Sequence, residues 1–341
     1  MKNKTFVVLV CVSCIFAFAS AAFSAEKAYT VKRLAADLHD RKLGVQAERE
    51  LPVYKAEAVQ YVLPILTEKQ IDSFVLVSAL NVLGKVGDSS IEDNIIPLLS
   101  SRDARVRLAA AQALVKIGTQ KSVEPLKVLM RDPSAEVRYR AVKALAAIAP
   151  SNEEEIFITA LKDGDARVRH FAATALGKLK TVNAVKPLSE LQGDGDTAVR
   201  IEVAKALGEI ATDESVDTLG NMCQDIDLGV KMTAVEYIGK IKSPKADEVL
   251  VKLTGNVDPR VASMALIWLG ERKHPKSIEI AGKYVNDEHM AMIMASIQVL
   301  GLVGGEKEKE ILKPLLAAES TKVRKAAQAA LDAIDKNLQH A

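Results

Sequence analysis

The stretch Asp103–Gly118, which reads DARVRLAAAQALVKIG, decides the fold of this chain. Asp103 carries a carboxylate that can accept hydrogen bonds from the free N–H groups at the start of a helix. Val106, Ala110 and Leu114 follow three, seven and eleven residues later. This spacing places the three side chains on one face of an α-helix. The stretch therefore predicts a capped amphipathic helix with a small residue in the middle of its apolar stripe.

The same pattern recurs every 31 residues through most of the chain. The position of Val106 holds valine in eight of nine copies and Met292 in the other. A fixed period of this length is typical of stacked structural repeats. The cap positions of the nine copies are Asp72, Asp103, Ser134, Asp165, Asp196, Asp227, Asp258, His289 and Ser320.

A second, less regular helix is predicted before each cap, for example over residues 123–130, 184–191 and 246–253. Pro125 and Pro187 stand near the starts of two of these helices, where a proline removes no intrahelical hydrogen bond. A single pair of helices cannot bury its own apolar face, so neighbouring pairs must stack. We predict an all-α fold, an α-solenoid of about nine to ten stacked helical hairpins.

The run D-x-x-V-R-x-x-A-x-x-A-L-x-x-I-G resembles the HEAT repeat, and its 31-residue form is similar to HEAT-like repeats of the phycobilisome-lyase type. The copies that begin at Asp103, Asp165 and Asp196 match best. Those at Asp72, Asp258 and His289 depart from the pattern, mainly because they lack the arginine. The resemblance covers about residues 72–335. It implies a fold and leaves the function open, because function resides in sites that differ among proteins of one fold.

The first residues differ in kind from the repeats. Lys2 and Lys4 precede an apolar run over residues 6–19, followed by small residues. This order is typical of a secretory signal peptide, which we assign to residues 1–25 and which predicts a periplasmic or secreted protein. An uncleaved anchor and a lipoprotein signal at Cys14 are the alternatives. The sequence leaves three cleavage positions open, after Ala22, Ser24 or Ala25.

Residues 26–71 are expected to form an N-terminal helical cap and the first repeat helix, and residues 72–341 the repeat array with a C-terminal capping helix. The chain has 46 basic and 44 acidic residues. Loss of residues 1–25 would remove two lysines and no acidic residue, which leaves a net charge of zero. Nucleic-acid binding generally needs a basic face, so we expect no nucleic-acid partner. We also expect no membrane insertion after signal cleavage.

No candidate for catalysis stands out in the sequence. None of the five histidines has a partner at metal-ligand spacing, and no phosphate-binding loop or nucleophile motif is present. Cys223 is the only cysteine beyond the predicted signal, and we expect it to be a small core residue. The prediction is a protein that is not an enzyme and has no catalytic, cofactor or metal site.

Basic residues recur four positions after the cap, and two interpretations of them are open. They could pair with cap aspartates of the same or an adjacent repeat, as HEAT-like repeats do, or they could form an anion-binding stripe. The number of nearby aspartates favours the structural interpretation. The residues are Arg107, Arg138, Arg169, Arg200, Lys231 and Arg324.

A row of apolar residues lies five positions after the cap, opposite the core stripe on the helix. In HEAT-like arrays the second helices line the concave side, so this row predicts a binding groove with a polar rim. The alternative is that tight curvature buries the row between neighbouring second helices. The predicted contact residues, with Ile267 nine positions after its cap, are Leu108, Tyr139, His170, Ile201, Met232, Ile267 and Met294.

Two further features concern close packing. Glycine recurs twelve positions after the cap, where bare backbone is required by either the adjacent helix or a bound segment. The segment Met290–Val303 is apolar on almost every side, so either the final repeat covers it or it awaits a partner. We therefore predict an exported, non-enzymatic scaffold that binds a protein or peptide along its concave face. The alternatives are a lyase-like or cofactor-handling protein, and a structural component that self-associates through Met290–Val303.

Overall fold

The computed structural model describes residues 26–148 and 154–339. All regular structure in these two ranges is helical. The chain divides into two compact units, residues up to Ile156 and residues from Phe157. The predicted signal peptide, residues 1–25, lies outside the described residues.

The first unit begins with a helix over residues 26–37. It is followed by a series of paired helices. These are α2 (Gly44–Glu50), α3 (Ala56–Val62), α4 (Ser73–Val86), α5 (Glu92–Ile95), α6 (Ala104–Ile117), α7 (Val123–Leu129) and α8 (Ala135–Ile148). The long helices α4, α6 and α8 pack side by side as the second helices of their repeats. Short 3-10 segments extend several first helices, such as Leu63–Thr67 after α3.

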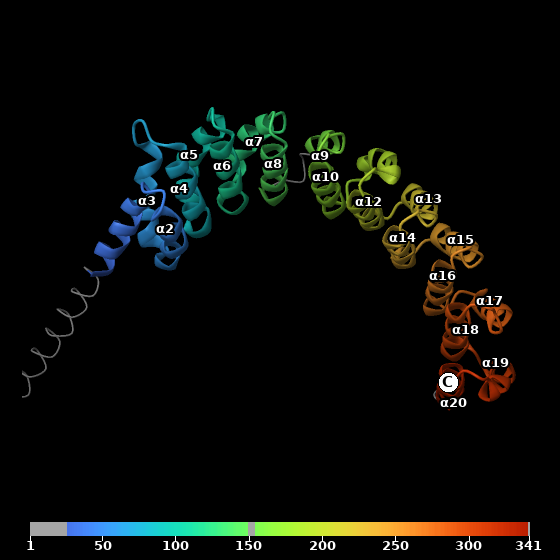
Figure 1. Cartoon of the computed structure of the whole chain (residues 1–341). Coiled ribbons are helices and arrows are strands. Elements are labelled where there is room, and N and C mark those ends of the chain that lie inside the picture. Colours follow the sequence, from blue (N-terminus) through green and yellow to red (C-terminus); the bar gives the residue numbers. More distant parts are fainter. Residues whose placement is uncertain (1–25, 149–153, 340–341) are drawn as a thin grey trace, which may run out of the picture. The chain divides into compact units, whose positions relative to one another are not determined.

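The second unit continues the same alternation, and α9 (Glu154–Ala160) crosses the boundary between the units. Its second helices form one layer, and its first helices form the other (Figure 1). The second helices are α10 (Ala166–Leu179), α12 (Thr197–Ile210), α14 (Leu228–Lys240), α16 (Pro259–Glu271), α18 (Met290–Val303) and α20 (Thr321–Gln339). The first helices are α11 (Val185–Ser189), α13 (Asp213–Met222), α15 (Pro244–Leu253), α17 (Ser277–Tyr284) and α19 (Glu306–Leu312).

The helix starts follow the sequence pattern. The cap side chains of all six aspartates accept a hydrogen bond from a backbone N–H of the first turn, as Asp103 does from Arg105 at 2.8 Å. His289 makes no such bond. Val106, Ala110 and Leu114 are buried, as are the corresponding residues of the other repeats. The prediction of an all-α solenoid is confirmed.

The glycines twelve positions after the cap, which we call the glycine column, leave space for the adjacent second helix. A Cβ on Gly84, Gly177 or Gly301 would lie 2.8–2.9 Å from the Cα of an alanine on the next second helix. Gly208 and Gly239 instead face the rings of Tyr237 and Trp268. Of the two reasons considered for bare backbone at these positions, the neighbouring helix is therefore the one observed.

Candidate functional site

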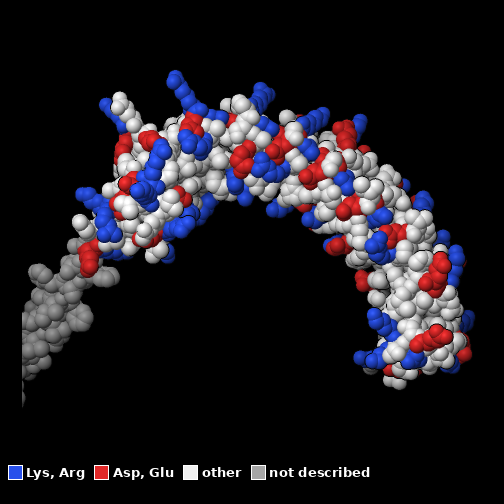
Figure 2. All heavy atoms as spheres, in the orientation of Figure 1, with Lys and Arg blue, Asp and Glu red and all other residues white. Residues whose placement is uncertain are grey.

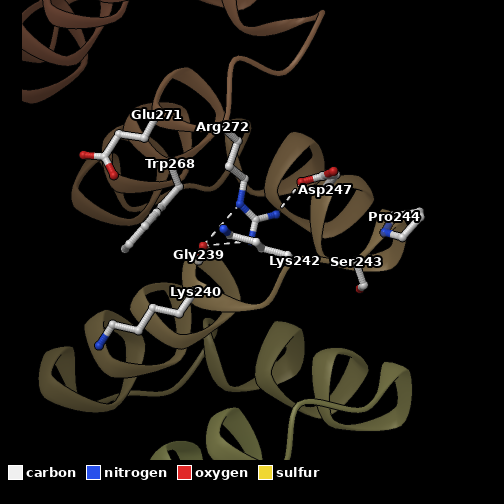
Figure 3. Close-up of a pocket in the computed structure, with 9 residues that line it drawn as sticks. All are labelled: Gly239, Lys240, Lys242, Ser243, Pro244, Asp247, Trp268, Glu271 and Arg272. Carbon is white, nitrogen blue, oxygen red and sulfur yellow. Dashed lines mark hydrogen bonds and ion pairs between the residues drawn. The ribbon is translucent and has the colours of Figure 1, made fainter.

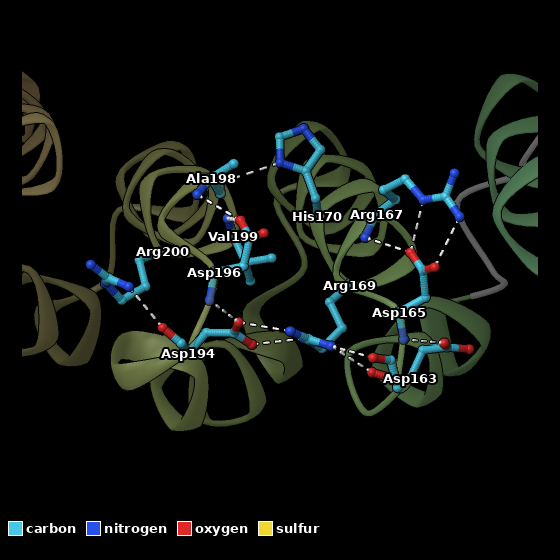
Figure 4. A network of polar contacts seen from close by, with 11 residues as sticks. Asp163, Asp165, Arg167, Arg169, His170, Asp194, Asp196, Ala198, Val199 and Arg200 are labelled. Atoms are coloured by element: carbon cyan, nitrogen blue, oxygen red, sulfur yellow. Dashed lines mark hydrogen bonds and ion pairs between the residues drawn. The ribbon is translucent and has the colours of Figure 1, made fainter. Parts of the chain in front are cut away.

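The basic column four residues after the cap is structural. Arg169 donates to both carboxylate oxygens of Asp194, each at 2.7 Å, and to the carbonyls of Asp163 and Gly164 (Figure 4). Arg107 and Arg200 bind Asp132 and Asp225 in the same way. Each guanidinium thus joins the turn of its own repeat to the turn of the next. These three arginines have their donors occupied and form no anion-binding stripe.

The partner of these arginines differs from the prediction. Asp132, Asp194 and Asp225 lie two residues before the cap, whereas we expected the cap aspartates themselves. The cap aspartates face the helix start, and Asp103, Asp165 and Asp258 also pair with the arginine two residues later. Lys231 follows the expectation, because it pairs with Asp258, the cap aspartate of the next repeat, at 3.2 Å.

The carboxylates of Asp132, Asp194 and Asp225, which we call the aspartate ladder, stay ionised well into the acid range. Burial raises the pKa of Asp194, but the hydrogen bonds from Arg169 and from the backbone N–H of Asp196 outweigh it. The net effect holds the pKa of this carboxyl below its ordinary value. The pKa values of Asp132 and Asp225 are lowered for the same reasons.

The predicted contact row is half-buried along its whole length. Leu108 and Tyr139 lie in the first unit, on α6 and α8. The other members lie in the second unit. They are His170 on α10, Ile201 on α12, Met232 on α14, Ile267 on α16 and Met294 on α18.

Neighbouring helices account for this partial burial. The Nδ1 atom of His170 lies 3.3 Å from the carbonyl oxygen of Ala198, at the start of α12. Ile201 packs beside Gly229 at the start of α14. These row members therefore cover the beginning of the next second helix and are only partly available to a ligand.

One apolar groove of about 650 Å³ brings two of the predicted residues together, Ile267 and Met294. It runs across α16, α18 and α20 in the second unit. Leu302 of α18 lines it, and α20 contributes a stripe of small side chains. These small residues are Ala326, Ala329, Ala330 and Ala333. We call this feature the C-terminal groove.

Three columns of the repeat explain why the groove lies here. Positions six, nine and thirteen after the cap lie on the face away from the first helices. In the repeat of α12 they hold Glu202, Lys205 and Glu209. In the repeat of α20 they hold Ala326, Ala329 and Ala333. The groove begins where this face changes from charged to apolar. Positions six and thirteen carry this change, and the predicted contact row did not include them.

The apolar helix α18 is covered only in part. Met292, Ile297, Val299 and Leu300 are buried against α16, α17 and α20, so the final repeat takes most of its surface. Met290 and Leu302 remain exposed, Leu302 to 44%. Figure 2 shows an uncharged stretch of surface over α16 and α18.

A second hollow, of about 740 Å³, adjoins the groove at Glu271, which lines both. Trp268, Lys240 and Lys242 line it with Arg272 (Figure 3). Arg272 is held by the end of α14, where it donates to the carbonyls of Ile238 at 3.1 Å and Gly239 at 2.7 Å, and it also pairs with Asp247. Its role is that of a helix cap.

The described residues do not meet the requirements of a metal site, a reactive thiol or a membrane-spanning helix. Within residues 26–148 and 154–339, no three His, Cys, Asp or Glu side chains are placed to hold a metal ion. Cys223 is fully buried, and burial raises the pKa of its thiol to about 12, which confirms it as a core residue. None of the helices described is both long and apolar enough to cross a bilayer.

The sequence matches the family of HEAT repeats over residues 72–134, 123–194, 186–262 and 248–332. The chain belongs to the HEAT-repeat family. The comparison does not distinguish the phycobilisome-lyase type within it. No curated protein matches the sequence.

Solved structures share the fold at low sequence identity. A crystal structure of an engineered protein is 22% identical, with a TM-score of 0.51, over 89% of this chain and 98% of that one. YibA of E. coli is 20% identical, with a TM-score of 0.49, over 79% and 99%. The karyopherin Kap121p, bound to the extreme C-terminus of the protein phosphatase Cdc14p, is 12% identical with a TM-score of 0.66. That alignment covers 92% of this chain and 43% of the karyopherin.

Proposed function

We propose that this protein is an exported, non-enzymatic scaffold that binds a short segment of a protein partner in the C-terminal groove. The groove carries the proposal, because a preformed apolar hollow with polar surroundings binds without a large ordering cost. Met294 and Leu302 offer flexible or exposed apolar contacts along one wall. The alanines of α20 leave room for a ligand along the other.

A structural neighbour supports a peptide as the partner. Kap121p has the same type of solenoid and was crystallised with the extreme C-terminus of another protein. The likeness lies in the fold, so it supports a mode of binding and leaves the partner of this chain open.

Export is part of the same proposal and rests on residues 1–25. We expect the mature chain in the periplasm or outside the cell, beginning after Ala22, Ser24 or Ala25. Intact mass of the protein purified from its native envelope fractions tests this. A full-length mass in the cytoplasmic fraction would contradict export.

The groove is tested with a display library of random 12-residue peptides. Leu302→Glu with Ala329→Glu places two charges in the groove at exposed positions, where folding should be preserved. The matched control is Ile226→Glu with Val257→Glu, two turn residues that are 96% and 91% exposed and lie outside the groove. Circular dichroism checks the helical content of both.

Peptides retained by the wild type and the control but lost by the groove variant would support the proposal. Tyr139→Glu with Met232→Glu serves as a third arm. Peptides lost only by that variant would move the site to the half-buried row. No enrichment, or enrichment unaffected by the groove variant, would overturn the groove as the binding site.

A second candidate function is self-association through α18. Met290 and Leu302 are exposed apolar side chains on this helix, and exposed apolar patches often mark interfaces. Light scattering over a range of concentrations separates the two candidates. A constant monomer mass would eliminate self-association.

The remaining alternative is a lyase-like or cofactor-handling protein. It rests on the 31-residue period, which resembles that of phycobilisome-lyase-type repeats. A visible absorption band in protein purified from its native source would favour it over the scaffold.

A further inference from the structure

The rim of the C-terminal groove differs in charge between its two sides. Lys322, Lys325 and Lys336 lie seven residues before, four before and seven after Ala329 on α20. This spacing puts them on the same helical face as that groove residue. All three are exposed. On the opposite side, α16 contributes Glu271.

These three lysines have no ion-pair partner among the described residues. The nearby acidic residues are otherwise engaged, since Asp335 pairs with Lys309 and Asp332 accepts a hydrogen bond from Gln328. On α12 and α14 of the same layer, by contrast, Lys205 pairs with Glu202 at 3.2 Å and Lys240 pairs with Glu236 of its own helix. Figure 2 shows basic side chains beside the uncharged surface, at the end of the molecule where α20 lies.

We infer that the partner segment is acidic: its apolar side chains fill the groove, and its carboxylates lie along α20. Charge complementarity carries the inference, since opposite charges at a rim set the orientation and selectivity of a partner. Glu271 favours one orientation of the bound segment, because a carboxylate of the segment on the α16 side would be repelled by the like charge of Glu271. The segment therefore has its acidic residues on one edge only.

This inference rests on the proposed function and is tested with the same peptide library. Enriched peptides should contain two or more Asp or Glu residues beside apolar ones. Enriched peptides that need the groove but show no acidic bias would overturn the inference and leave the proposed function standing. Enriched peptides that bind the groove variant as well as the wild type would overturn both the inference and the proposed function.

Charge reversal gives the sharper measurement. Lys322→Glu with Lys325→Glu and Lys336→Glu should weaken an enriched peptide roughly tenfold in Kd, as expected for three exposed ion pairs. The same variant should bind better to a version of that peptide with lysines in place of its acidic residues. The control reverses Lys162, Lys186 and Lys307, three exposed lysines outside the groove.

Fluorescence anisotropy of labelled peptides gives both affinities. Equal loss in the two triple variants would show a general charge effect and would overturn the inference. An unchanged affinity in the α20 variant would overturn it as well.

Discussion

Gly239 shows how a single residue sets the contact between two repeats. A Cβ at this position would lie 2.2 Å from ring atoms of Trp268 on the next second helix. Tyr237 occupies the equivalent place against Gly208. Large rings fit between these helices only because the glycines leave the backbone bare.

We expect Gly239→Ala to lower the free energy of unfolding by about 1–3 kcal/mol, because overpacking outweighs the gain in helix propensity. Gly282 of α17 is the control, since its added Cβ would meet only Ile311 at 3.7 Å. Gly282→Ala should stabilise the protein by up to about 1 kcal/mol. Urea denaturation of both variants measures the difference. A stabilising Gly239→Ala would contradict this account of the glycine column.

The aspartate ladder predicts a dependence of stability on pH. The pKa values of Asp132, Asp194 and Asp225 are lowered in the folded protein. Their contribution to stability is therefore complete above the ordinary carboxyl pKa and is lost as the pH falls through it toward the folded values.

Urea midpoints should stay level from neutral pH down to about pH 5 and then decline. Asp194→Asn should cost about 1.5–3 kcal/mol at neutral pH, because Arg169 is left without its carboxylate. The variant should also lose less stability on acidification than the wild type. Glu190→Gln, an exposed change in the same repeat, should leave the curve unchanged.

At the scale of elements, Arg272 joins the end of α14 to α16. Its guanidinium donates to the carbonyls of Ile238, Gly239 and Ile241 at the end of α14, where backbone donors run out. Backbone N–H groups also reach the carbonyls of Ile238 and Ile241, so Arg272 adds to the bonds that the chain makes itself. Arg272→Met keeps the apolar stem and removes these donors. We expect a loss of about 1.5–3 kcal/mol in the free energy of unfolding.

Hydrogen exchange should quicken at the end of α14 in this variant. Arg131→Met, at an exposed arginine of the first unit, is the control. Equal exchange in both variants would show that water caps α14 as well as Arg272 does.

At the scale of the whole molecule, stability comes from neighbours along the stack. In the second unit, α12 packs against α10 and α14, while α18 packs against α16 and α20. A solenoid of this kind unfolds in parts, because each repeat depends on the next and not on one common core.

Leu207→Ala truncates a fully buried side chain of α12 and should cost about 2–5 kcal/mol locally. Mapped by hydrogen exchange, the loss of protection should be largest in α10, α12 and α14 and small in α18 and α20. Uniform loss across the second unit would contradict this local view of its stability.

The period of 31 residues, the cap aspartates and the stripe of Val106, Ala110 and Leu114 were enough to predict the stacked helical hairpins. Such local signals suffice because each repeat is a short-range unit that meets only its neighbours. They also predicted Ile267 and Met294 as contact residues, and the structure places both in the C-terminal groove.

Only the tertiary structure decided where the groove lies and which aspartates the arginines bind. Both depend on distances between residues about 25 to 60 positions apart, which helical spacing within one repeat does not fix. The half-burial of His170 and Ile201 has the same cause, since the next helix covers them.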